Sequence, residues 1–144
     1  MFGFRNKRAK ATDEAVLYLR SMFAGLLEIE DEGLPDRVFS DPYVAGFLQV
    51  LTTHAVANVY RWRMPETTTI NEILEEGLTR LRGHGATARR TLEQSSAPTH
   101  VLHAQYLDGR RDGSEHVRTL FTSDGIARNA PHQSFRSYVK RHYL

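Results

Sequence analysis

Cysteine is absent from this chain of 144 residues, of which 40% are hydrophobic and 25% are charged. The absence excludes disulfide bonds, thiolate catalysis and the cysteine ligands of zinc-finger and iron–sulfur sites. It is compatible with a reducing compartment, and we expect a cytoplasmic protein. The hydrophobic and charged fractions are those of an ordinary globular domain, so global disorder is excluded as well.

Motifs that identify a reaction are missing too. The chain has no G-x-x-x-x-G-K phosphate loop, no G-x-G-x-x-G turn, no G-x-S-x-G nucleophile and no H-E-x-x-H pair. The sequence therefore favours a non-enzymatic protein, and it predicts no cofactor.

Long hydrophobic runs are scarce. Residues 42–60 contain no Lys, Arg, Asp or Glu, and a stretch of that length is long enough to span a membrane. Gln49, His54 and Asn58 lie within it, however, and amide and imidazole groups are costly in hydrocarbon. We therefore expect a buried central helix rather than a membrane span. A secretory signal is not expected either, because the basic residues near Met1 are followed by polar ones.

The five prolines divide the chain into stretches that mostly show the helical period. They predict an all-α fold, a single-domain bundle of four to six helices around a central buried helix at about 42–63. Asp41 and Pro42 are a clear start signal for that helix, as N-cap and first helical residue. Residues 1–11 are predicted to be a mobile basic arm, and residues 12–144 a single helical domain.

The other predicted helices surround the central one. The first begins with Thr12 as its N-cap, and another runs from Thr69 to about Glu93 with a weak point at two glycines. A basic amphipathic helix follows Pro131. Residues 101–121 fit either a helix or a short hairpin, and we favour the helix.

Charge is distributed unevenly along the chain. Residues 1–11 have four basic and no acidic residues, residues 12–60 have two basic and eight acidic, and residues 61–144 have thirteen basic and nine acidic. Basic residues interleaved with aromatic ones are typical of surfaces that bind anions or single-stranded nucleic acid. The candidate contacts are Arg5, Lys7, Arg8, Lys10, Arg61, Arg63, Arg136, Lys140 and Arg141.

Polar side chains suggest two further candidate sites. His54, Asn58 and Trp62 follow one another at intervals of one helical turn on the predicted central helix. They predict either a buried hydrogen-bond network or a pocket with a polar floor, and we favour the network. His100 and His103 would project to the same side of a helix, and His116 or Asp108 could complete a divalent-metal site with them, but two ligands do not make a site and we expect no bound metal.

These observations predict a function class without identifying a reaction or a ligand. We expect a non-enzymatic interaction protein that acts through apolar helix faces and forms a homodimer, and a protein partner stays an option. Two alternatives stay open. One is a nucleic-acid-associated protein that uses the basic N-terminal arm and the basic C-terminal helix. The other is a small-molecule-binding bundle with a polar pocket at His54 and Asn58.

Overall fold

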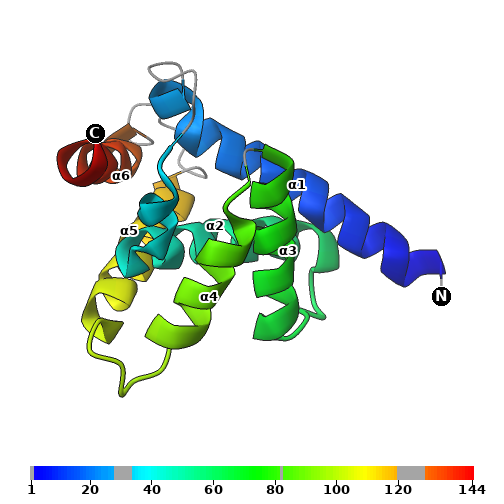
Figure 1. The fold of residues 1–144 in the computed structure, drawn as a ribbon. Helices are drawn as coiled ribbons and strands as arrows, with labels where there is room; N and C mark the ends of the chain where they lie inside the picture. The colour runs from blue at the N-terminus through cyan, green and yellow to red at the C-terminus, as the bar shows by residue number, and fades with distance from the viewer. Residues whose placement is uncertain (1, 28–33, 82, 120–128) are drawn as a thin grey trace.

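The computed structural model describes residues 2–27, 34–81, 83–119 and 129–144 of the chain (Figure 1). These residues form six α helices and one short 3₁₀ helix and contain no strand, which confirms the predicted all-α fold. The elements are α1 (Phe2–Leu27), η1 (Asp36–Ser40), α2 (Pro42–Tyr60), α3 (Thr67–Leu81), α4 (Gly85–Ser95), α5 (His103–Thr119) and α6 (Asn129–Tyr143).

Helix α2 is the centre of the bundle, as the sequence predicts. The carboxylate of Asp41 accepts a hydrogen bond from the backbone N–H of Tyr43 at 2.8 Å. Pro42 has no N–H, which costs nothing at the first helical position because an N–H there has no partner within the helix. Every residue from 42 to 52 is buried, and α2 packs against all the other elements. No helix of the described residues combines the length and the hydropathy that a membrane crossing requires.

Helix α1 begins at Phe2, well before the predicted N-cap Thr12. The segment 2–11, predicted as a mobile arm, forms the first turns of α1 in the structure. The Thr12 hydroxyl donates to the Arg8 carbonyl at 2.9 Å inside the helix, so Thr12 is not a cap. Ala11 and Ala15 are fully buried and pack with apolar residues of α2 and α3. This packing supports helical structure well before the predicted start.

The prediction of one continuous helix from Thr69 to about Glu93 is wrong, because the structure has two helices there, α3 and α4. Gly83, with φ 88°, and His84, with φ 67°, both adopt left-handed backbone that a right-handed helix cannot include. The His84 ring stacks on Phe39 with 4.8 Å between ring centroids. Tertiary contacts therefore hold a non-glycine residue in a conformation that local propensity disfavours.

Helix α5 confirms the helical alternative for residues 103–119 of the region 101–121, whereas residues 120 and 121 lie outside the described residues. It lies directly on α2, and the two helices are so close that a Cβ atom on Gly109 would overlap the carbonyl oxygen of Tyr43. Helix α6 then covers the assembled core with Phe135 and Val139, which are both fully buried. This agrees with the basic amphipathic helix predicted after Pro131.

Buried polar side chains between α2, α3 and α5 satisfy one another. The amide nitrogen of Gln49 donates to Asn71 at 2.9 Å, and its amide oxygen accepts from the Tyr106 hydroxyl at 2.6 Å and from Arg110. The Arg110 guanidinium also lies 5.8 Å from the centroid of the Tyr106 ring. Buried polar groups are stable when hydrogen-bonded, so this network fixes how the three helices are aligned.

Candidate functional site

The turn between α2 and α3, residues 61–66, presents charged and aromatic side chains to solvent. Arg61 ends α2 by adopting a φ of 56°, a conformation that costs a non-glycine residue about 1–3 kcal/mol. Pro65 disfavours helical backbone in Met64 before it, so α3 cannot begin before Pro65, and it begins at Thr67. Arg61, Trp62 and Arg63 are all exposed as a result.

Basic residues near the start of α1 line one groove together with residues of the same turn. The burial of Ala11 fixes the first turns of α1 against α2 and α3. One turn earlier, the Lys7 ammonium lies 6.0 Å from the centroid of the Tyr60 ring, and Arg8 forms an ion pair with Glu72 at 3.1 Å. Packing of α1 therefore brings the N-terminal basic residues and the arginines that follow α2 to one place.

These side chains line a groove with a volume of about 560 Å³, inside the range of about 300–1,000 Å³ that is usual for ligand sites. Three of its lining residues are basic and none is acidic. The groove is lined by Lys7, Arg8, Tyr60, Arg63, Met64, Pro65 and Thr69. We call this groove, together with Arg61 and Trp62, the basic-aromatic surface.

Trp62 is the most exposed large apolar side chain of the described residues, at 95%, and Met64 in the same turn is 41% exposed. Isolated exposed apolar side chains are ordinary on protein surfaces. Here, however, Trp62 lies in the chain between two arginines, and one of them, Arg63, lines a groove with two further cations. An open indole can stack on a planar ring while the cations neutralise negative charge. The arrangement suits an anion that is attached to a planar group.

The three residues predicted to share a pocket do not come together. His54 is half-buried and meets the Tyr18 ring edge-on at 5.4 Å, and the Asn58 amide donates to the Tyr18 hydroxyl at 3.1 Å. Burial lowers the pKa of His54, and the Glu14 carboxylate opposes that shift. His54 and Asn58 therefore belong to the packing of α1 on α2, whereas the Trp62 side chain lies in solvent.

The predicted anion contacts divide between the two ends of α1. Lys7, Arg8, Arg61 and Arg63 belong to the basic-aromatic surface, and Lys10 is exposed on the next turn of α1. Arg5 lies on α1, but its side chain is outside the described residues.

The basic residues of α6 lie at the other end. Arg136 donates to the carbonyls of Ser21 and Met22, and Lys140 and Arg141 are exposed. Met22 and Lys7 are roughly 22 Å apart along α1 at 1.5 Å per residue. Figure 1 shows α6 at the far end of α1 from the N-terminus, so the two basic groups do not form one surface.

Histidines of the last third take part in local contacts. The His100 ring accepts the Leu102 N–H at 3.1 Å, and the His103 ring lies 2.9 Å from the Ser95 carbonyl oxygen. His116 is buried beside Phe47 on α2. In the part of the chain that the structure describes, no three His, Asp or Glu side chains are grouped closely enough to hold a metal ion.

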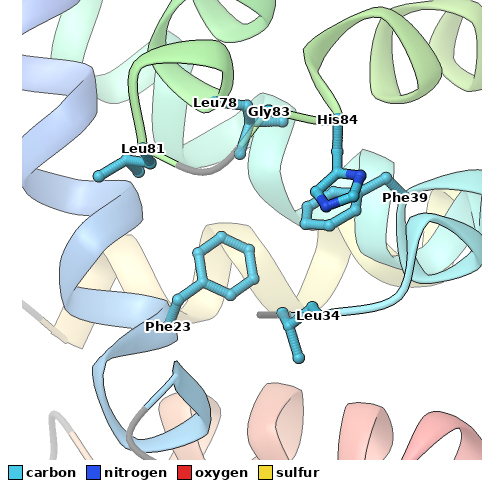
Figure 2. A pocket seen from close by; sticks show the side chains of 7 residues that line it. All are labelled: Phe23, Leu34, Phe39, Leu78, Leu81, Gly83 and His84. Atoms are coloured by element: carbon cyan, nitrogen blue, oxygen red, sulfur yellow. The ribbon is translucent and has the colours of Figure 1, made fainter. Parts of the chain in front are cut away.

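An apolar cavity beside the turn between α3 and α4 is too small for an organic ligand. Its volume is about 10 Å³, which is room for roughly one water molecule. Figure 2 shows its lining, which consists of Phe23, Leu34, Phe39, Leu78, Leu81, Gly83 and His84.

Several residues of the basic-aromatic surface are not predicted from the sequence, namely Tyr60, Met64, Pro65 and Thr69. One signal in the sequence could have located them. Ala11 and Ala15 follow Lys7 by one and two helical turns, so the three residues share one face of the helix. Small apolar residues at that spacing indicate that the first turns of the helix pack against the domain.

Comparisons with protein-family models, with curated proteins and with solved structures find no match to this chain.

Proposed function

We propose that the protein is a non-enzymatic binding protein that holds single-stranded nucleic acid on the basic-aromatic surface. The observation behind the proposal is the exposed indole of Trp62, which Arg61 and Arg63 flank in the chain, in a turn whose Arg63 lines a groove with Lys7 and Tyr60. Bases stack on open aromatic rings for about 1–3 kcal/mol each, and basic side chains neutralise the adjoining phosphates.

A single strand suits this surface better than a duplex. In a duplex the base faces are stacked on one another, so an exposed indole has no base face to contact unless a base is unpaired. Stacking tolerates every base, and contacts to phosphate do not read sequence. We therefore expect binding with little sequence preference.

Homodimerisation through apolar helix faces stays a prediction. The apolar stripes of α1, α2 and α3 are buried within the chain, so they supply less support for it than the basic-aromatic surface supplies for nucleic-acid binding. Light scattering tests it, with a mass near twice 16.4 kDa expected for the dimer. A cytoplasmic location also stays a prediction, supported by the absence of cysteine.

Fluorescence of the protein's single tryptophan tests the proposal directly, because Trp62 is that tryptophan. Stacking on a base should quench its emission when an oligothymidylate of about 12 nucleotides is added. If Lys7, Arg61 and Arg63 each contact one phosphate, the logarithm of affinity should fall with the logarithm of salt concentration with a slope of roughly −2. Absence of quenching and of binding at low salt would overturn the proposal.

Two double variants that remove equal charge locate the site. R61Q/R63Q should weaken binding of a fluorescently labelled oligothymidylate about tenfold or more and flatten the salt dependence. K140Q/R141Q is the matched control, since both side chains are exposed on α6 at the other end of α1. Equal weakening by the two variants would contradict the placement of the site. Binding to phosphatidylserine vesicles without any binding to the oligonucleotide would overturn the proposed function itself.

A further inference from the structure

Arg8 lies at the boundary between two grooves, one lined by cations without acidic residues and the other lined by three carboxylates and three guanidiniums. It lines the groove of the basic-aromatic surface, which has no acidic lining residue, and also a second groove of about 730 Å³. The second groove contains three carboxylates, those of Glu72, Glu75 and Glu76. The Arg8 guanidinium is paired with the nearest of them, Glu72, at 3.1 Å.

Glu72 has a second cation within reach. One carboxylate oxygen contacts Arg8, and the other lies 3.7 Å from the guanidinium of Arg89 on α4. Arg89 in turn pairs with Glu75 at 3.4 Å and with Glu93 at 3.1 Å. If Arg8 turns to another anion, the charge of Glu72 stays close to Arg89, so release of Arg8 does not leave an isolated carboxylate.

We infer that Glu72 sets the affinity and the extent of the nucleic-acid site by competing with a phosphate group for Arg8. This inference rests on the proposed function. A strand that occupies the groove next to Lys7 and Arg63 brings a phosphate toward Arg8, and a guanidinium forms bidentate hydrogen bonds with phosphate. Exchange of Glu72 for phosphate conserves the number of ion pairs at Arg8, so the gain in affinity is small while Glu72 is present.

The ion pairs of the second groove also limit the length of strand that is bound, because its arginines are already paired with carboxylates. Beyond Arg8, Glu75 pairs with Arg89 at 3.4 Å and Glu76 pairs with Arg80 at 3.3 Å, so a phosphate there would have to displace a carboxylate from its arginine. The strand is therefore confined to the side of Arg8 where Lys7, Arg61 and Arg63 lie.

The test is a set of charge-removing variants titrated with the same oligothymidylate. E72Q should raise affinity about two- to fivefold, which is the range of an exposed ion pair, and should steepen the salt slope by roughly 0.7 for one further phosphate contact. Adding R8Q to E72Q should abolish the gain. E76Q is the matched control, because Glu76 lies on the same helix and groove but pairs with Arg80 at 3.3 Å.

The outcomes separate this inference from the function on which it rests. Quenching of Trp62 in the wild type, with no gain from E72Q, an equal gain from E76Q, or a gain that R8Q leaves intact, would overturn the inference and leave the proposed function standing. Absence of binding by both the wild type and E72Q would overturn both. Glu72 is partly exposed, and unchanged circular dichroism of E72Q verifies that the fold is intact.

Discussion

The carboxylate of Asp41 accepts a hydrogen bond from the hydroxyl of Tyr138 at 2.7 Å, which joins the start of α2 to α6. The same oxygen accepts the Tyr143 hydroxyl at 2.6 Å, and the other oxygen accepts the Tyr43 backbone N–H. One side chain therefore caps the central helix and anchors the last helix of the chain.

Two substitutions of Asp41 separate those roles. Asp41→Asn keeps an oxygen for the cap but replaces the acceptor of the two tyrosines with a donor, and we expect a loss of about 1–2 kcal/mol in the free energy of unfolding. Asp41→Ala also removes the cap and should cost about 2–4 kcal/mol. Urea unfolding of both variants measures the difference. Equal stability of the wild type and Asp41→Asn would show that the tyrosine bonds do not hold α6.

Alkaline pH should destabilise the protein through the same tyrosines. Burial, followed by the hydrogen bond to Asp41, raises the pKa of Tyr138 and of Tyr143. Unfolded tyrosine titrates near pH 10, so the unfolded state loses protons first as the pH rises. The stabilisation is fully present below about pH 10 and is lost as the pH rises above it toward the raised values. Urea unfolding between pH 8 and 11 should show the loss.

A tyrosine-to-phenylalanine pair is the control for that pH dependence. Y138F/Y143F removes both titrating hydroxyls, so its free energy of unfolding should be lower than that of the wild type at pH 8 but should fall less steeply above pH 10. Parallel curves for the variant and the wild type would contradict the assignment.

The sequence predicts α2 well because its signals are local. Asp41 and Pro42 are adjacent to the helix that they start, and apolar residues on two faces indicate burial on both. It fails at His84, because the left-handed backbone there is supported by Phe39 and Asp36, which are more than forty residues away. No local pattern contains that information.

The candidate site shows the same division. The basic residues Lys7 and Arg63 are visible in the sequence as charge, but their proximity depends on how α1 packs over α2. The partner of Gln49 is equally hidden, since Arg110 follows it by 61 positions. A central polar residue indicates that a partner exists, and only the fold shows which residue it is.

Glycine should be better tolerated than alanine at His84. Both substitutions remove the stacking on Phe39 and the bond to Asp36, but glycine adopts a φ of 67° without a steric penalty. We expect His84→Gly to be about 1 kcal/mol more stable than His84→Ala in urea unfolding, the reverse of the order in a helix interior. The usual order at this position would contradict the left-handed conformation.

A methyl group at Gly109 should disrupt the contact between α2 and α5. Its Cβ would overlap the backbone of Tyr43, and two helix backbones cannot yield as a flexible side chain can. Gly109→Ala should cost about 3 kcal/mol or more, despite the higher helix propensity of alanine. Ser114→Ala, at an exposed position of the same helix, should be neutral or slightly stabilising. Thermal unfolding followed by circular dichroism distinguishes the two, and similar melting temperatures would contradict the close approach.

Substitution of His54 by leucine tests whether this residue stabilises the fold or takes part in binding. Burial lowers the pKa of His54, so the unfolded state, which titrates near pH 6.5, binds a proton more readily than the folded state. The stability of the wild type should therefore be full above pH 6.5 and should decline as the pH falls below it.

At pH 8, His54→Leu should lose about 1 kcal/mol, because the edge-on contact with Tyr18 and the hydrogen-bonding groups of the imidazole are removed. Leucine does not titrate, so the difference in the free energy of unfolding between the variant and the wild type should narrow from pH 8 to pH 5 in urea unfolding. A variant as stable as the wild type that no longer gains thermal stability from the oligonucleotide would instead place His54 in the binding site.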